Sequence, residues 1–235
     1  MWCLEDLRSI DTFSWSPKGV ALKEGKPAAW EGVYSGYPYA ADGYNKYFDF
    51  AVKDAKVFLN HPLRVHCLAK KEFLINDEVT SFDIVVSTVS PDLLFEGAIS
   101  LPFIGRRLEK VVLPVEYAFP KDVYFTYYGQ NEKYTRIVEY KKFTKHSSPS
   151  TLIGIEYPEI NGRKDYPIPL KREQRVASAL FEQLPENFFT MGRAGSYLYQ
   201  IDIDDCIEQA HELSRQVSSG IYEGPVPCKQ YHFDL

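Results

Sequence analysis

Apolar residues recur at helical spacing in three stretches of the chain. The first follows Asp42, which can cap a helix, and its apolar residues are Tyr44, Tyr47, Phe48, Ala51 and Val52. The second runs from about residue 171 to 184, with the apolar residues Val176, Ala177, Leu180, Phe181 and Leu184. The third follows Asp202, from about residue 203 to 217, with Ile203, Cys206, Ile207, Ala210 and Val217. This spacing predicts three amphipathic helices, and the apolar stripe of the second is expected to be buried.

Short apolar runs between turn residues predict strands in the rest of the chain. Three runs precede residue 76, at 57–59, 65–68 and 72–75, and residues 83–88 form a run typical of a buried strand. Ser90 and Pro91 then predict a short helix. Between Leu108 and Pro158, four runs predict an antiparallel sheet, around 111–112, 123–128, 134–143 and 152–157. Residues 188–191 predict a last strand before Gly192.

This mixture of helices and strands predicts an α+β (mixed α/β) fold. The 235 residues, 45% hydrophobic and 25% charged, are typical of a soluble globular protein of one large or two small domains. A net charge of −5 argues against nucleic acid held mainly through its phosphates. No apolar run is long enough to predict a membrane span and no export signal is recognisable, so we expect a cytoplasmic protein.

Several familiar sites have no support in the sequence. No G-x-G occurs, so the usual glycine-rich turn of a dinucleotide-binding fold is missing, and no G-x-S-x-G predicts a serine nucleophile. The four cysteines lie far apart without a C-x-x-C, which predicts neither a zinc site nor a disulfide framework. Cys228 and His232 have the chemistry of half a metal site, but two such residues near a terminus are far more often incidental.

Two segments place arginine, tyrosine and glycine where a packed core does not need them. In the first, a strand from Tyr134 to Phe143 would put Arg136 on one face, flanked by tyrosines. This suits a phosphate or carboxylate ligand, although a cross-strand ion pair would explain it equally well. In the second, a strand ends at Gly192, Arg193 follows, and a loop with Tyr197 and Tyr199 leads to a helix start. A helix start can stabilise an anion, but a hairpin turn and a capped helix would give the same pattern.

Together these segments resemble the C-terminal half of UDP-galactopyranose mutases, flavoenzymes that interconvert the pyranose and furanose rings of UDP-galactose. Members of that family have a Tyr-Thr-Arg-Ile strand, a Glu-Tyr-Pro, a Gly-Arg, spaced tyrosines, and an aspartate that opens the final helix. The same features occur here in that order, as Tyr134-Thr135-Arg136-Ile137, Glu156-Tyr157-Pro158, Gly192-Arg193, Tyr197, Tyr199 and Asp202. One such motif would be weak evidence, but several in order are hard to reach by chance.

Weaker similarities extend the resemblance toward the N-terminus. Asp42-Gly43-Tyr44 is similar to the family's Gly-Gly-Tyr, residues 83–88 to its buried strand near the flavin, and Trp2 with Asp6-Leu7 to its Trp-Gly-Arg-Asp region. The resemblance covers about residues 2–213 and implies the rear part of an amine-oxidase-like flavoprotein fold. The front part, with the glycine motif for FAD, has no counterpart in these residues, which implies an N-terminal FAD-binding half or separate chain as partner.

The resemblance also implies roles for individual residues. Arg136, Tyr157 and Tyr199 would bind the diphosphate of a UDP-sugar, and Trp2 would lie near its uridine or sugar. Arg193 and the start of the last helix would line the flavin, with Asp202, Ile203, Asp204 and Asp205 facing its pyrimidine edge. The family's aspartate corresponds to either Asp202 or Asp204. The cofactor would be FAD, reduced for activity, and the family's chemistry is carried by the flavin rather than by a catalytic side chain.

The implied organisation has five segments. They are a substrate-side segment of helices and irregular chain (1–55), a returning part of the FAD-binding domain (56–100), a substrate-domain sheet (101–187), a flavin-facing strand, loop and helix (188–218) and a tail (219–235). The chain would act as an isomerase in cell-wall polysaccharide synthesis, and homo-oligomers are compatible with this. Two other functions stay open: a non-catalytic nucleotide-sugar-binding module, and a flavin oxidoreductase of the amine-oxidase type.

Overall fold

The computed structural model describes residues 42–95, 99–128, 131–160 and 162–220, together with Pro38 and Ala40. Chain contacts divide these residues into two compact units. Of the described chain, the first unit holds residues up to 59 and residues 106–159, and the second holds residues 60–105 and 160–220. The boundary therefore falls within two long strands, and each unit is described by itself. Trp2 and the predicted tail beyond residue 220 lie outside the described residues.

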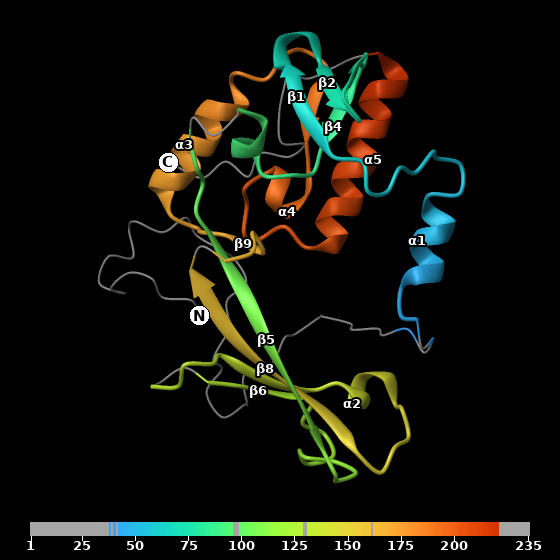
Figure 1. Ribbon diagram of the computed structural model, residues 1–235, viewed down its shortest axis with the longest axis vertical. Helices are drawn as coiled ribbons and strands as arrows, with labels where there is room; N and C mark the ends of the chain where they lie inside the picture. The colour runs from blue at the N-terminus through green and yellow to red at the C-terminus, as the bar shows by residue number, and fades with distance from the viewer. Residues whose placement is uncertain are drawn as a thin grey trace. The chain divides into compact units, whose positions relative to one another are not determined.

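The first unit is built around an antiparallel sheet. Its elements are α1 (Asn45–Ala51), most of β5 (Phe103–Leu113), β6 (Phe125–Tyr127), β7 (Arg136–Glu139), α2 (Lys141–Thr144) and most of β8 (Thr151–Ile160). The strand order is β6-β7-β8-β5, and Figure 1 shows the long β5 and β8 side by side. The predicted antiparallel sheet is confirmed. The predicted strand at 134–143 is too long, because the chain turns into α2 after Glu139.

The interior of the first unit is unusually polar. Glu139 is fully buried, and its carboxylate accepts hydrogen bonds from the Ala118 and Phe119 N–H groups at 2.9 and 3.0 Å and from the Thr151 hydroxyl at 2.7 Å. The Lys142 ammonium lies 3.5 Å away and donates to backbone carbonyls of residues 119, 120 and 123. The acidic and basic residues that follow Arg136 thus tie the 118–123 loop to β7 and α2.

Glu139 should make the protein sensitive to acid. Burial alone would raise the pKa of this carboxyl, but its hydrogen bonds from Ala118, Thr151 and Phe119 and the Lys142 charge outweigh burial and lower it. Its stabilising contribution is therefore present above the unfolded pKa of about 4.3 and is lost as the pH falls through the lower folded value. Glu139→Gln should lower the free energy of unfolding by about 2–4 kcal/mol at neutral pH.

Urea unfolding followed by circular dichroism checks this prediction. Between about pH 6 and about pH 3, the wild type should lose more stability than Glu139→Gln, because the variant has no carboxyl to protonate at this position. Glu78→Gln, at an exposed position, is the matched control and should change stability by less than about 0.5 kcal/mol. Equal acid sensitivity in wild type and Glu139→Gln would contradict the assignment.

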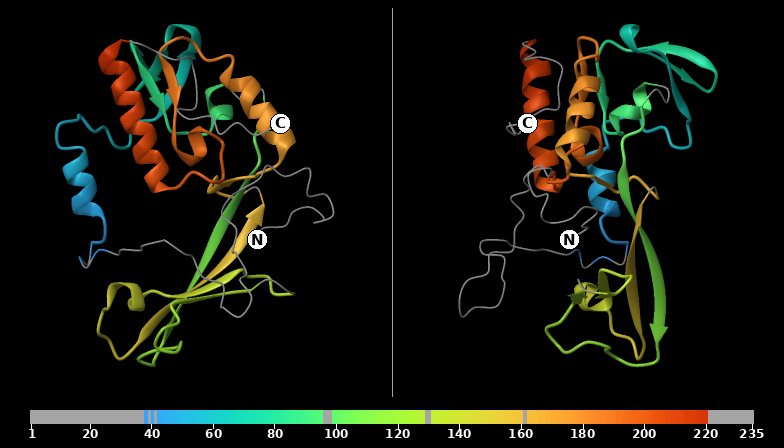
Figure 2. Two further views of the ribbon diagram at one scale, coloured as in Figure 1. Left: turned by 180° about the vertical axis from the view of Figure 1, so that it is seen from behind. Right: turned by 90° about the vertical axis from the view of Figure 1, so that its left-hand side faces the viewer.

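The second unit has a layered arrangement. Its short elements are β1 (Leu63–Cys67), η2 (Leu68–Lys70), β2 (Glu72–Ile75), β3 (Glu78–Ser81), η3 (Pro91–Leu94), β9 (Tyr166–Pro167) and α4 (Gly192–Gly195), and its helices are α3 (Lys171–Phe181) and α5 (Ile203–Ser219). A parallel pair, β4 (Val85–Ser87) and β10 (Phe188–Thr190), lies between α5 and the β1-β2-β3 sheet, as the right view of Figure 2 shows. Phe188 contacts Phe73 of β2, and Phe189 packs on Leu213 of α5.

The three longest helices can be compared with the helices that the apolar periodicity predicts. Helix α3 buries Ala177, Leu180 and Phe181 as predicted. Helix α5 begins after Asp202 as predicted, but it buries Gln209 and Leu213, whereas Ile203 and Ile207 of the predicted stripe are 77% and 44% exposed. Helix α1 is present, but Tyr44 and not Asp42 is its N-cap, and none of its residues is buried. The predicted helices are therefore present, the predicted cap is wrong for α1, and the apolar faces of α1 and α5 are largely exposed in the described chain.

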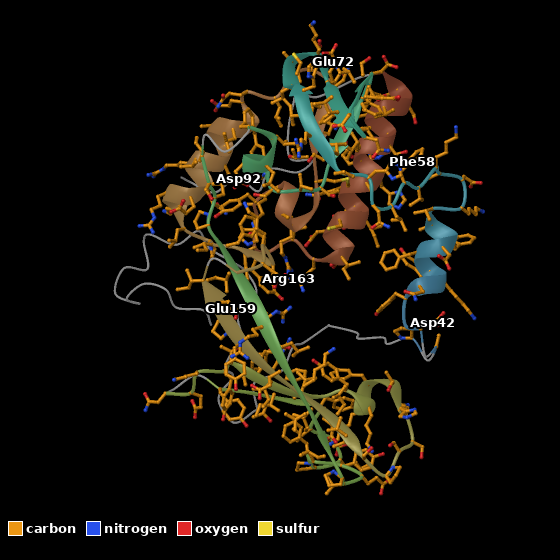
Figure 3. The ribbon with its side chains drawn as sticks, viewed as in Figure 1. Asp42, Phe58, Glu72, Asp92, Glu159 and Arg163 are labelled. Carbon is orange, nitrogen blue, oxygen red and sulfur yellow. The ribbon has the colours of Figure 1, made fainter. Side chains whose placement is uncertain are left out.

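The remaining elements follow the α+β prediction with local differences. The short helix after Ser90 is a 3₁₀ turn, η3, and residues 57–59 form no strand. The strand pattern missed β3. In η3, the Asp92 carboxylate, labelled in Figure 3, accepts hydrogen bonds from the Ser90 hydroxyl, the Leu101 N–H at 3.0 Å and the Lys164 ammonium at 2.5 Å. Burial would raise the pKa of Asp92, but these partners lower it. The five segments predicted from the sequence stay predictions.

Candidate functional site

Arg136 is fixed by the pairing of β7 with β8. The antiparallel register places Arg136 opposite Glu156 on one side and Tyr127 of β6 on the other. The Arg136 Nη2 donates to Glu156 Oε1 at 2.7 Å, and its Nη1 lies 3.4 Å from the Tyr127 hydroxyl. Burial alone would lower the pKa of Arg136, but the Glu156 carboxylate outweighs burial and raises it. Arg136 therefore stays a cation over the whole working pH range.

A second arginine shares the same carboxylate. The Arg106 Nη1 of β5 donates to Glu156 Oε2 at 2.9 Å, so each oxygen of Glu156 contacts one guanidinium. Glu156 is only 7% exposed, whereas the side chains of Arg106 and Arg136 are 30% and 25% exposed. We call Arg106, Arg136 and Glu156 the arginine pair site. It carries two positive charges against one negative charge, which suits an anionic ligand.

The opposite face of the same sheet carries Tyr157. Successive strand residues point to opposite faces, so Tyr157 and Arg107 lie on the other side from Glu156 and Arg106. The contacts agree, because the Arg107 guanidinium lies 4.1 Å from the Tyr157 ring centroid and 3.4 Å from Glu159, which is labelled at the end of β8 in Figure 3. Partial desolvation and the nearby Glu109 raise the pKa of the Tyr157 hydroxyl. The structure does not bring Tyr157 to the face of Arg136.

In the second unit, Arg193 lies at the centre of another cluster. Its Nε donates to the Ile201 carbonyl at 2.8 Å, and its Nη2 donates to Asp202 Oδ1 at 2.6 Å. The same guanidinium lies 5.1 Å from the Tyr166 ring centroid and 5.8 Å from the Tyr199 ring centroid, within cation–π reach. Three residues predicted from the sequence, Arg193, Tyr199 and Asp202, therefore lie together.

Two glycines set the position of this cluster. Gly192 has φ +76°, a conformation that favours glycine, and its N–H donates to the Gln209 side chain of α5 at 2.8 Å. Gly195 passes so close to β4 that an added Cβ would lie 2.8 Å from the Ser87 carbonyl oxygen. The Gly-Arg-Ala-Gly run therefore forms the short helix α4 against the strand, with Arg193 directed to the start of α5.

The acidic residues at the start of α5 act first as a helix cap. The Asp205 carboxylate accepts the Asp202 N–H at 2.8 Å, and the two residues form a capping box. Asp204 and Ile203 are exposed. Helix capping alone therefore explains why Asp202 and Asp205 stand at this helix start. The ion pair of Asp202 with Arg193 is an additional contact that a helix cap does not need.

The predicted site residues fall in both units. Arg136 and Tyr157 belong to the first unit, Tyr199 and Arg193 with Asp202–Asp205 belong to the second, and Trp2 lies outside the described residues. Arg106 and Tyr166 were not predicted from the sequence, and Glu156 entered the prediction only as part of a motif. The run from Phe103 to Leu113 has four charged residues, so no local signal in it singles out Arg106.

Comparison with known proteins decides the family. The family model for UDP-galactopyranose mutase matches residues 4–199. The chain belongs to the UDP-galactopyranose mutase family. The resemblance seen in the sequence motifs is confirmed. No curated protein matches the sequence.

The fold agrees with that family. A crystal structure of reduced UDP-galactopyranose mutase matches with a TM-score of 0.62 and 13% sequence identity, over 80% of this chain and 53% of the other. This chain therefore spans about half the length of that mutase. Among the described residues no helix is long and apolar enough to cross a membrane, and no cluster of three or more metal-ligating side chains occurs.

The described residues fit one end of a flavin. Arg193, the Tyr166 and Tyr199 rings and the first turn of α5 combine a cation, aromatic surface and backbone N–H donors, which suits the polar edge of a flavin ring. The FAD diphosphate usually needs a glycine-rich turn at a helix start, and the chain has no G-x-G. The donor set thus fits the flavin ring and leaves the diphosphate to other residues.

Proposed function

We propose that this chain is the substrate-binding portion of a flavin-dependent UDP-galactopyranose mutase, and that an FAD-binding portion outside the 235 residues completes it. The observation that carries the proposal is the family match over residues 4–199, with the family's motif arginine, Arg136, held at a partly exposed cationic site. The reaction would interconvert UDP-galactopyranose and UDP-galactofuranose in the cytoplasm, for cell-wall polysaccharide synthesis. Conversion of UDP-galactofuranose by the completed protein tests it.

In this proposal the residues of the chain bind the substrate and stabilise charge. Arg136 binds the diphosphate and stabilises the negative charge that develops when UDP leaves the sugar. Tyr199 donates a hydroxyl hydrogen bond to the substrate, and Trp2 lies near the uridine or sugar, whereas Tyr157, on the other face of the sheet, has no part in binding the diphosphate. Arg193 and Asp202–Asp205 hold the flavin ring, with Asp202 or Asp204 in the role of the family's aspartate. When bound, the reduced flavin would supply the nucleophile of the reaction.

The second unit offers a surface on which a completing portion fits. Parallel sheets are normally larger than two strands and covered on both faces, yet β4 and β10 are the only parallel pair among the described residues. Phe189 of β10 is buried under α5, while its neighbour Val86 of β4 is 43% exposed. Helix α5 also presents Ile203 and Ile207 to solvent. We infer that the FAD-binding portion, in the same chain or another, adds parallel strands and a covering helix here.

A charge on α5 should weaken this docking. Ile207→Arg changes a residue that is 44% exposed in the described chain, and an arginine there can extend into solvent, so the fold should stay intact. Affinity for a co-expressed FAD-binding portion should fall by at least about ten-fold, since an arginine would have to be buried without a partner. Val112→Arg, at an exposed position of the first unit, is the matched control. Unchanged affinity of Ile207→Arg in calorimetric titration would rule out α5 as the docking surface.

A non-catalytic nucleotide-sugar-binding module is the second candidate. The missing G-x-G and the match to about half of the solved mutase favour it over a complete enzyme. Such a module would bind UDP without flavin and convert no sugar. A flavin oxidoreductase of the amine-oxidase type would instead oxidise an amine and leave UDP-galactofuranose unchanged.

A further inference from the structure

The arginine pair site has two cations that a purely structural ion pair would not need. One arginine is enough to neutralise Glu156, yet Arg106 and Arg136 both contact it, from strands on either side of β8. Because they share one carboxylate, the two guanidiniums are held close together on one face of the sheet. The buried Arg136 Nε has no hydrogen-bond partner in the described structure, so this guanidinium retains an unused donor direction.

The rim of this face is aromatic and exposed. Phe125 and Tyr127 of β6 lie beside Arg136, with their ring centroids 5.7 and 5.6 Å from its guanidinium carbon. Both aromatic side chains are exposed. A pair of guanidiniums next to an aromatic rim matches a nucleoside diphosphate, whose two phosphates need separate cations and whose base can stack.

We propose that Arg106 is a second diphosphate-binding residue, and that it acts with Arg136 on this face of the sheet. The proposal rests on the proposed function for the presence of a UDP ligand, and it adds a residue to which the family motifs assign no role. Arg136 and Arg106 each bind one phosphate, while Glu156 keeps both guanidiniums in position. The opposite face, with Arg107 and Tyr157, takes no part in phosphate binding.

Neighbouring arginines provide the matched test. Arg106 and Arg107 are adjacent in β5 but point to opposite faces, so Arg106→Gln and Arg107→Gln remove the same charge from the two sides of one strand. Calorimetric titration with UDP and with UMP, on the full chain, measures both affinities. Arg106→Gln should weaken UDP binding by about ten- to thirty-fold and UMP binding by less than about three-fold, because only the diphosphate uses the second cation.

The ratio of the affinities for UDP and UMP distinguishes the loss of a phosphate contact from a loss of folded protein. If Arg106 had only a structural role, Arg106→Gln would weaken the binding of UDP and of UMP by the same factor, and this result would overturn the proposal. Arg106→Lys keeps the charge and should therefore retain more of the preference for UDP over UMP than Arg106→Gln does. If Arg106→Gln fails to fold, Arg106→Lys is the variant that is measured. Equal losses of UDP affinity in Arg106→Gln and Arg107→Gln would contradict the assignment of the diphosphate to the face that carries Arg106. If Arg136→Ala weakens UDP binding and Arg106→Gln does not, the inference fails while the proposed function stands.

Discussion

Arg136→Ala is expected to weaken UDP binding by about one hundred-fold. Removal of a charged, hydrogen-bonded partner of a phosphate costs roughly 2–3 kcal/mol, and each 1.4 kcal/mol is about ten-fold in affinity. The protein should remain folded, because Glu156 keeps its 2.9 Å hydrogen bond from Arg106 and is not left as an unpaired buried charge. Calorimetric titration with UDP measures the loss, and circular dichroism checks the fold.

Arg136→Lys provides the conservative comparison. Lysine keeps the charge but not the planar fork that contacts Glu156 and a phosphate together, so its affinity should lie between those of wild type and Arg136→Ala. The pKa of Arg136 is raised, so its guanidinium stays charged from about pH 6 to about pH 8 and contributes to UDP binding at both. Wild-type affinity in Arg136→Ala would exclude the phosphate role of β7.

Flavin retention is expected to require both the chain and an FAD-binding portion. The chain alone offers a cluster for the flavin ring but no glycine-rich turn for the diphosphate, so it should purify without the yellow flavin absorbance. Co-expression with an FAD-binding portion of a UDP-galactopyranose mutase should yield a complex that keeps FAD through size-exclusion chromatography. A complex that forms but stays colourless after incubation with FAD would contradict this prediction.

Arg193 gives this prediction a residue-level control. Arg193→Ala removes the 2.6 Å ion pair with Asp202 and the cation beside Tyr166 and Tyr199, and it should weaken FAD retention by about ten-fold or more. Arg175→Ala removes an exposed arginine of α3 and should have no effect on flavin. Spectrophotometric FAD titration of the two complexes makes the comparison.

The local sequence pattern predicted the strand position of Arg136 but not the residues that contact it. Arg136 follows from a strand motif, and its position in β7 is confirmed. The contact of Arg136 with Glu156 depends on the register of β7 against β8, and the contact of Glu156 with Arg106 needs a third strand, β5, from elsewhere in the chain. Periodicity within one strand contains no information on either pairing. Tyr157 illustrates the same limit, because the motif puts it next to Glu156 and the pleat turns it to the other face.

Helix α5 shows a second limit of the pattern. Its period of apolar residues and its Asp202 cap correctly predict a helix, but the stripe with Ile203 and Ile207 is exposed and Leu213 is buried. A periodic stripe indicates an apolar face and does not indicate which polypeptide covers it. In α3 the described chain supplies that cover. In α5 it does not, which agrees with a chain that spans about half of the mutase it resembles.

The most direct test of the proposed function is turnover by the completed protein. The complex of this chain with an FAD-binding portion, reduced with dithionite, should convert UDP-galactofuranose to UDP-galactopyranose, as followed by anion-exchange chromatography. Arg136→Ala in the same complex should keep its flavin and lose most of this conversion. A complex that holds reduced FAD and binds UDP, yet converts no UDP-galactofuranose, would contradict the mutase assignment and favour the binding module.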